Sequence, residues 1–171
     1  MIDFRSRFVA ALPEVPADHY LHLDEFVEFE RADVSRLASE DADLLKRQGM
    51  PRAAAPYLSF EAYSPEEMDE LLQSSGLPDS NFPIGHNGSG DIVAIDTESR
   101  EIIYFNHDAN DVRVFINSSL QQFAESLCIY QEHLTRQDLQ ECLAAIRRVD
   151  AAAVAAGAMW HDELARRQAG Y

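Results

Sequence analysis

The chain has 171 residues, of which 46% are apolar, so a packed core is expected and a wholly disordered protein is excluded. It carries 30 acidic and 14 basic residues, which gives a formal net charge of -16 at pH 7. Such a negative field repels nucleic acid and anionic membranes, and it speeds the arrival of a basic partner. The same charge also serves solubility alone, so the composition leaves both interpretations open.

Several absences in the sequence predict a cytoplasmic protein. No apolar run approaches the length of a membrane-spanning helix. The first residues carry an early acid and lack a long apolar stretch, so a secretory signal is not expected. Cys128 and Cys142 both fall in helical patterns and suggest no disulfide framework, which fits a reducing compartment.

The first third of the chain predicts two helices. Apolar residues at helical spacing indicate a short helix that ends before Pro13. Residues 19–30 contain many strand formers, but their type is ambiguous. Ser39 is a plausible N-cap for a second helix, which ends at Gly49.

A strand is predicted over residues 57–63, and a helix with clear end signals follows it. Ser64 supplies the N-cap, Pro65 fits the first helical position, and Glu67 completes a capping box. Gly76 then ends the helix.

The glycine-rich segment at residues 82–96 is the most informative part of the chain. Two short apolar runs flank a turn that contains Gly85, Gly88 and Gly90. Glycines between two strands indicate a tight reversal, because glycine reaches positive φ at little steric cost. The run after the turn is β-branched and predicts a strand, and the glycine spacing matches neither nucleotide-binding pattern. A phosphate-binding loop is therefore not expected.

The rest of the chain predicts more strands and then helices. Strands are expected at residues 91–96, 101–106 and 111–117, with connections short enough for antiparallel hairpins. Ser118 or Ser119 caps the following helix, and two further helices carry Leu139 and Trp160. The predicted fold class is α+β, a central antiparallel β-meander flanked by N- and C-terminal helices, in one domain over residues 1–171.

Several short motifs in this order resemble the SUKH (SMI1-like) superfamily, and most closely its fourth immunity-protein group. They are Asp41-x-Asp43-Leu44-Leu45, Gly49-Met50-Pro51, Pro83-Ile84-Gly85, Gly88-x-Gly90-Asp91, Ile95-Asp96 and Ser118-Ser119-Leu120-x-x-Phe123. The resemblance covers roughly residues 35–135. It leaves the first 30 or so residues and a helical C-terminal extension unexplained.

The resemblance implies a non-enzymatic bacterial immunity protein that binds and neutralises a cognate polymorphic toxin, many of which are nucleases. Its implied partner is a protein toxin, which the negative charge predicts to be basic. No cofactor, nucleic acid or membrane is implied, and the expected state is a monomer or weak homodimer. The alternative is an SMI1-like regulatory or scaffold protein that binds an endogenous partner.

The resemblance and the charge together give the candidate site residues. Gly85, Gly88, Gly90 and Asp91 are expected to build the turn, with Asp91 accepting backbone N–H groups there; contact with a ligand is the other interpretation. Acids concentrate between Asp18 and Asp43, which predicts a docking surface for a basic protein. The predicted partner-binding residues are Asp24, Glu25, Glu28, Glu30, His107 and Asp108. The candidate aromatic anchors are Phe82, Tyr104 and Phe105, with core packing the safer expectation for at least one of any two strand neighbours.

No catalytic or metal site is predicted. His86, Asp91, Asp96, His107 and Asp108 lie on different turns, and no pair has a dedicated ligand spacing. No serine lies in a Gly-x-Ser-x-Gly elbow, and both cysteines lie in apolar helical surroundings. The third hypothesis is an enzyme that uses the His86–Asp108 region. It ranks below the other two because no catalytic motif is assembled there.

Overall fold

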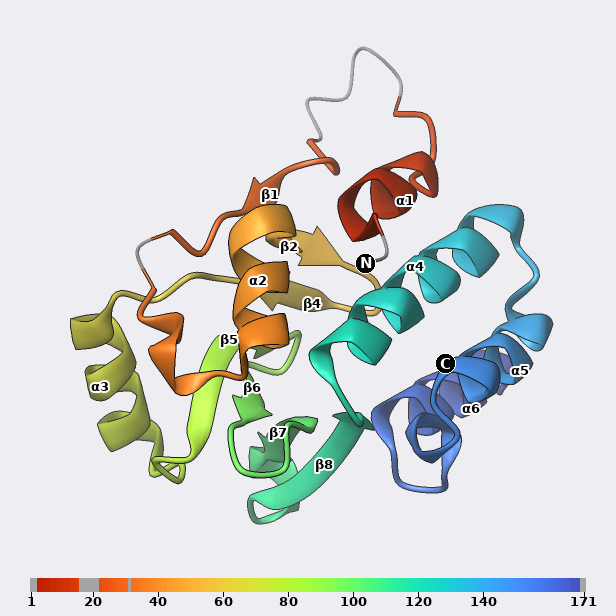
Figure 1. Ribbon diagram of the computed structural model, residues 1–171. Helices are drawn as coiled ribbons and strands as arrows, with labels where there is room; N and C mark the ends of the chain where they lie inside the picture. The colour runs from red at the N-terminus through yellow and green to blue at the C-terminus, as the bar shows by residue number, and fades with distance from the viewer. Residues whose placement is uncertain (1–2, 16–21, 31, 170–171) are drawn as a thin grey trace.

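The computed structural model describes residues 3–15, 22–30 and 32–169. It confirms the α+β class: a six-stranded antiparallel sheet and a small two-stranded sheet combine with helices at both ends of the chain (Figure 1). In the described part of the chain, no helix has the length and apolarity needed to cross a membrane.

The predicted elements occur in the predicted order, but the strand expected over residues 57–63 covers only residues 58–60, and short strands and 3-10 turns are added in the described residues. The helices are α1 (Phe4–Ala10), α2 (Ser39–Gln48), α3 (Pro65–Ser75), α4 (Leu120–Arg136), α5 (Leu139–Val149) and α6 (Met159–Gln168), with 3-10 turns η1 (Val34–Arg36), η2 (His107–Ala109) and η3 (Ala152–Val154). The strands are β1 (Phe26–Val27), β2 (Met50–Pro51), β3 (Ala53–Ala54), β4 (Leu58–Phe60), β5 (Asn81–Asn87), β6 (Ile92–Asp96), β7 (Ile102–Asn106) and β8 (Val112–Asn117).

The large sheet is a simple meander with the strand order β3-β4-β5-β6-β7-β8, and β1 pairs with β2 separately. Each strand pairs antiparallel with the next one along the chain. Consecutive connections therefore alternate between the two ends of the sheet. The turns at residues 55–57, 87–91 and 107–111 share one end, which we call the loop end.

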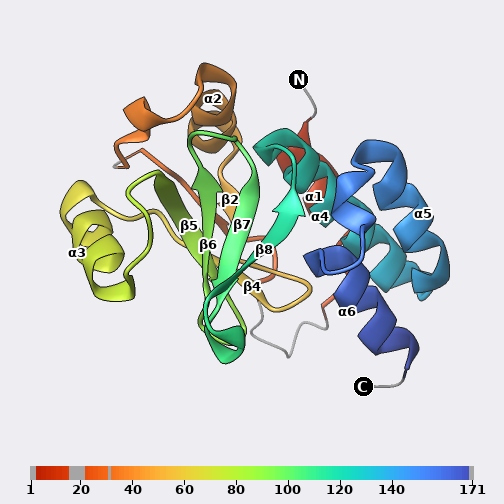
Figure 2. The same ribbon diagram turned by 90° about the horizontal axis from the view of Figure 1, so that it is seen from below.

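One face of the sheet supplies the main core. Phe82 pairs with Ile95 and Ile95 with Ile102, so their side chains share a face, and all three are buried. Phe123 of α4 and Trp160 of α6 belong to the same apolar cluster. In Figure 2, strands β5–β8 lie in the middle, with α3 on one side and α4, α5 and α6 on the other.

The helix ends follow the local signals closely. Both hydrogen bonds of the capping box between Ser64 and Glu67 are present, and Gly76 ends α3 in the left-handed conformation. Ser119 caps α4. The predicted cap at Ser39 is wrong: α2 begins at that residue and Ala38 occupies the cap position without a side-chain hydrogen bond. Acids in the first turn of α2 supply the favourable interaction with the helix dipole instead.

A buried polar network attaches the C-terminal helices to the sheet. The carboxylate of Asp150 accepts hydrogen bonds from the backbone N–H of Ser118 at 2.7 Å, the hydroxyl of Ser118 at 3.0 Å and the side-chain amide of Asn117 at 3.1 Å. Asn117 in turn accepts the indole N–H of Trp160 at 2.9 Å. The end of β8, the end of α5 and the start of α6 are thereby held together, a role that the sequence analysis did not assign to Asp150.

Candidate functional site

The turn between β5 and β6 is built around Asn87. Its side-chain oxygen accepts the backbone N–H groups of Ser89 at 2.9 Å and Asp91 at 3.0 Å. Gly90 has φ +87°, which glycine adopts at little cost. The expectation that Asp91 accepts N–H groups of its own turn is therefore wrong. Asn87 takes that role, and its side-chain amide also donates a hydrogen bond to Asp91 at 2.8 Å.

Gly85 lies inside strand β5 and not in the turn, which corrects the predicted assignment. The register between β5 and β6 shifts next to it, between Pro83 and Gly85. A Cβ at this position would lie 2.1 Å from the backbone oxygen of Ser59 on β4. Glycine is therefore required here by the close approach of the neighbouring strand.

Asp91 joins two turns of the loop end. Its carboxylate is 3% exposed and accepts the backbone N–H of His107 at 3.1 Å, and it lies 2.5 Å from Nδ1 of the His107 ring. The ring is exposed on its other side, with Nε2 3.3 Å from Asp108. The β5–β6 and β7–β8 turns are thus connected by one buried carboxylate.

The two partners shift each other's proton affinity in opposite directions. Burial alone would raise the pKa of Asp91, but hydrogen bonds from Asn87 and His107 outweigh it and hold that pKa below its ordinary value. The hydrogen bond to Asp91 raises the pKa of His107, and the negative charge of Asp108 raises it further. A charged pair is therefore favoured in the folded protein.

Replacing His107 by glutamine is expected to lower the free energy of unfolding most between pH 3.8 and 6.5, the ordinary pKa values of the two groups. Because the pKa of His107 is raised by folding, protonated His107 contributes its full stabilisation at pH values below the pKa of the unfolded state. This contribution is lost as the pH rises through the pKa of the folded state. The lowered pKa of Asp91 stabilises above its unfolded value and is lost as the pH falls through the folded one. Urea unfolding of both proteins from about pH 3 to about pH 9 measures the difference. A difference independent of pH would contradict the pairing, as would its persistence in an Asp91→Asn background.

A groove of about 540 Å³ opens beside this pair, between the end of α3 and strands β6 and β7. We call it the loop-end groove. Its apolar lining residues are Leu77, Pro78, Ile92 and Phe105, and its polar ones include Ser75, Ser89, Asp91, His107 and Asp111. Gly90 also lines it. The structure thus brings Gly90, Asp91 and His107 together at one opening, with Asp108 next to His107.

A second hollow lies on the other side of the glycine turn, next to an exposed tyrosine. Tyr57 is 73% exposed and has φ +58°, an uncommon conformation for a bulky residue. It touches the space beside Gly88, where an added Cβ would lie 2.9 Å from the Cβ of Tyr57. Tyr57 was not predicted as a site residue. The one feature of the sequence that points to it is the proline directly before it, which indicates a turn.

The predicted aromatic anchors differ in how deeply they are buried. Phe82 is fully buried, so its prediction as an anchor is wrong, because β5 lies inside the sheet with a covered face. Tyr104 and Phe105 are half-buried on opposite faces of β7. Tyr104 lines the hollow beside Tyr57, whereas Phe105 lines the loop-end groove.

The predicted acidic docking segment is partly neutralised by the protein's own arginines. Glu25 forms an ion pair with Arg52 at 3.0 Å, and Glu28 lies 3.6 Å from Arg5. Asp24 and Glu30 are exposed, whereas Asp18 lies outside the described residues. Buried Asp41 accepts two hydrogen bonds from Arg100, both at 3.1 Å.

The least balanced charge lies further along the chain, at residues 61–111, where 12 acids accompany a single base, Arg100. That arginine is engaged with α2. On α3, Glu66, Asp69 and Glu70 are exposed and form no ion pair with any described residue. The count is visible in the sequence, whereas only the structure shows that the acids of α3 lack basic partners among the described residues.

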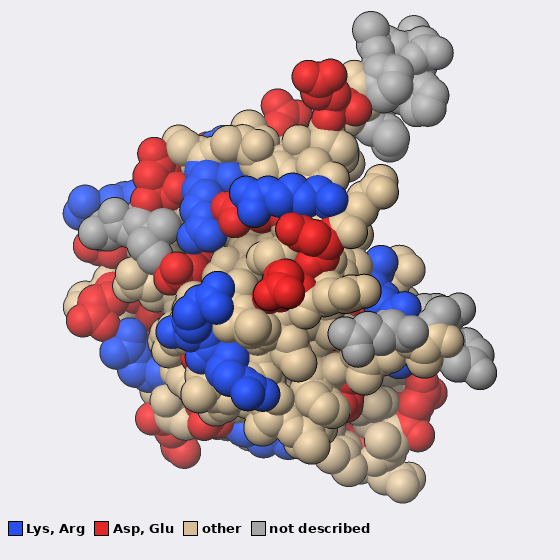
Figure 3. Space-filling model, turned by 90° about the vertical axis from the view of Figure 1, so that its right-hand side faces the viewer, with Lys and Arg blue, Asp and Glu red and all other residues tan. Residues whose placement is uncertain are grey.

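The helical side of the molecule differs in charge. In Figure 3, arginine and lysine side chains lie beside carboxylates, and uncharged surface fills much of the view. Residues 119–171 contain 7 acids and 5 bases, so this part of the chain is nearly neutral. The net negative charge is therefore unevenly distributed along the sequence.

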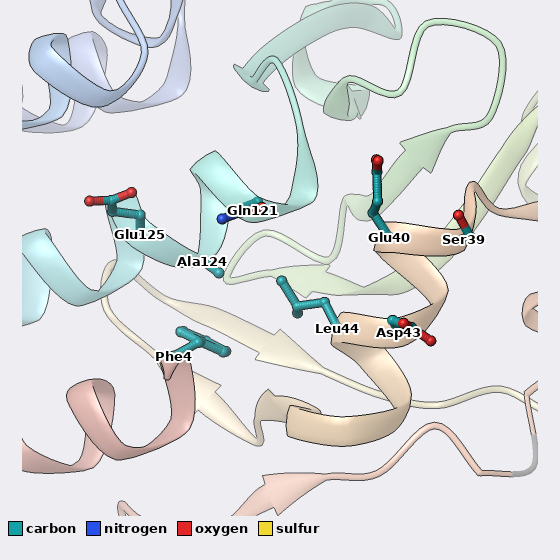
Figure 4. A pocket seen from close by; sticks show the side chains of 8 residues that line it. All are labelled: Phe4, Ser39, Glu40, Asp43, Leu44, Gln121, Ala124 and Glu125. Carbon is teal, nitrogen blue, oxygen red and sulfur yellow. The ribbon is translucent and has the colours of Figure 1, made fainter. Parts of the chain in front are cut away.

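A further hollow of about 300 Å³ lies between α1, α2 and α4 (Figure 4). Phe4, Leu44 and Ala124 form its apolar part. The carboxylates at its edge each have an arginine partner in the chain: they are Glu40 with Arg100, Asp43 with Arg47 and Glu125 with Arg7. Two of these arginines are shared, because Arg7 also pairs with Glu132 and Arg100 also pairs with Asp41.

The residues considered for a metal or catalytic site have other contacts in the described structure. No group of three or more His, Cys, Asp or Glu side chains in this part of the chain is arranged to hold a metal ion. Of the five residues considered for such a site, His86 contacts the carbonyl of Asn87 and Asp96 accepts a hydrogen bond from Arg113. Burial raises the pKa of both Cys128 and Cys142 to about 12, so neither thiol is ionised at neutral pH.

Comparison with known families gives one match that covers most of the chain. The model of the SUKH-4 immunity protein matches residues 16–167. The chain belongs to the SUKH-4 immunity protein family. The match extends beyond residues 35–135 on both sides, so the C-terminal helices are part of the SUKH-4 pattern. No curated protein and no solved structure matches the chain.

Proposed function

We propose that this SUKH-4 protein is a non-enzymatic bacterial immunity protein that binds and neutralises a cognate toxin in the cytoplasm. Membership of the SUKH-4 immunity protein family is the observation that carries the proposal. The partner is a basic protein domain, because the net charge of -16 attracts positive surfaces. A nuclease fits this description, since nucleases bind phosphates through basic surfaces.

Neutralisation on this proposal is stoichiometric covering of the toxin's active site or substrate groove. The negative field raises the association rate and helps to select the partner. Aromatic side chains next to hollows set the dissociation rate: Tyr57 is exposed, and Tyr104 and Phe105 are half-buried there. The exposed side chains of Asp24, Glu30, His107 and Asp108 add polar contacts.

Co-expression with the toxin domain encoded by the neighbouring gene tests the proposal. The expected result is that host cells survive only when both proteins are made, and that the purified pair elutes as a 1:1 complex. An unrelated acidic protein of similar size, expressed in the same way, controls for charge alone. Neither a complex nor protection of the cells would contradict the proposal.

A further inference from the structure

The loop-end groove combines accessible apolar surface with a face of the sheet that is separate from the main core. Ile92 and Phe105 line it and are half-buried, unlike the fully buried Val93 next to them. Val93 pairs with Tyr104, so Ile92 and Phe105 share the opposite face. In Figure 2 this region of β6 and β7 is seen with α3 to one side of it. Leu77, which follows α3, closes the groove on that side.

The rim of the groove is held in place before any partner arrives. The Asp91–His107 pair fixes one edge. Asn110 and Asp111 continue that edge, and both have positive φ of 55°. A preorganised surface loses less conformational entropy on binding, which favours affinity.

The charge around the groove selects the chemistry of its occupant. Asp111 lines the groove and is exposed. Asp108, two residues after the end of β7, is also exposed. The acids of α3, Glu66, Asp69 and Glu70, lie on the helix that ends at the groove and have no basic partner among the described residues. The carboxylates at the edge of the hollow in Figure 4 differ in that each contacts an arginine of the chain.

We propose that the loop-end groove is the docking site for the toxin, and that it takes an apolar side chain flanked by lysine or arginine. This inference rests on the proposed function. The apolar side chain packs on Ile92 and Phe105, while the flanking cations face Asp111 and the acids of α3. Exposed carboxylates beside an apolar centre complement an apolar side chain flanked by cations.

Two neighbouring serines provide a matched test. Ser74 and Ser75 are both exposed in the last turn of α3, and both hydroxyls donate to the carbonyl of Leu71. Ser75 lines the groove, whereas Ser74 is not among its lining residues. Ser75→Arg adds bulk and positive charge at the groove, and Ser74→Arg adds the same group outside it.

The expected result is that Ser75→Arg weakens binding of the neighbouring gene's toxin domain by about 10-fold or more, while Ser74→Arg changes it by less than about 3-fold. Affinities are measured by titration calorimetry, and thermal unfolding checks that both variants fold. Equal affinity of the two variants would overturn the groove proposal and leave the proposed function standing. Failure of the unmodified protein to bind would overturn both.

The role of the acids of α3 can be tested separately. Neutralising Glu66, Asp69 and Glu70 to their amides is expected to slow association with the toxin domain by about 5-fold or more at low salt. A second triple variant, Asp138→Asn, Glu141→Gln and Asp162→Asn, removes the same charge from the C-terminal helices and is expected to have a smaller effect. Equal slowing by both variants would contradict a docking site beside α3. If Ser75→Arg instead converts a dimer of this protein into monomers, the occupant is a second copy and the proposal is wrong.

Discussion

Replacing Gly85 by alanine is expected to destabilise the protein by about 3 kcal/mol or more. The added Cβ would lie 2.1 Å from the backbone oxygen of Ser59 and 2.8 Å from the Cα of Phe60, so β4 and β5 must separate. The φ of +155° at this residue adds strain for any other amino acid. Urea unfolding monitored by circular dichroism measures the loss.

Gly90→Ala is the matched control for this prediction. Gly90 has φ +87°, but no atom lies within 4 Å of the position of an added Cβ. The expected loss is therefore about 1–2 kcal/mol, from the backbone conformation alone. If Gly85→Ala is no worse than Gly90→Ala, the close approach of β4 is not what requires glycine at residue 85.

Asp150→Ala is expected to cost about 3 kcal/mol or more, because it removes a buried carboxylate that accepts four hydrogen bonds. Asp150 is 4% exposed, and the donors that it satisfies belong to Asn117, Ser118 and Ala152. Differential scanning calorimetry is the measurement. We also expect increased hydrogen exchange in α5 and α6, since the network attaches these helices to β8.

The control for Asp150 is the aspartate at the other end of α5. Asp138 is 44% exposed, and its side chain contacts the ring of His133 at 2.7 Å. Asp138→Ala is expected to cost less than about 1 kcal/mol, because this carboxylate is open to solvent. A similar loss in both variants would show that the buried network contributes little.

The candidate site was only partly accessible from the sequence. The glycine turn, Asp91 and His107 were identified, and the structure places Gly90, Asp91 and His107 at one groove. The acids at Glu25 and Glu28 were chosen by local density, but arginines from other segments neutralise them. A count of charges along a chain does not show which of them are paired across the fold.

The order and type of the longer elements follow from the sequence alone, because their signals are local. The capping box at Ser64, the glycine stop at Gly76 and the short hairpin connections each act within a few residues. Tertiary structure alone decided the roles of Gly85, Arg100 and Asp150. Gly85 is required by the close approach of β4. Arg100 pairs with Asp41, 59 residues away in sequence, and Asp150 accepts a hydrogen bond from Asn117, 33 residues away. Contacts between segments so far apart in sequence depend on how the chain packs, and no local pattern encodes them.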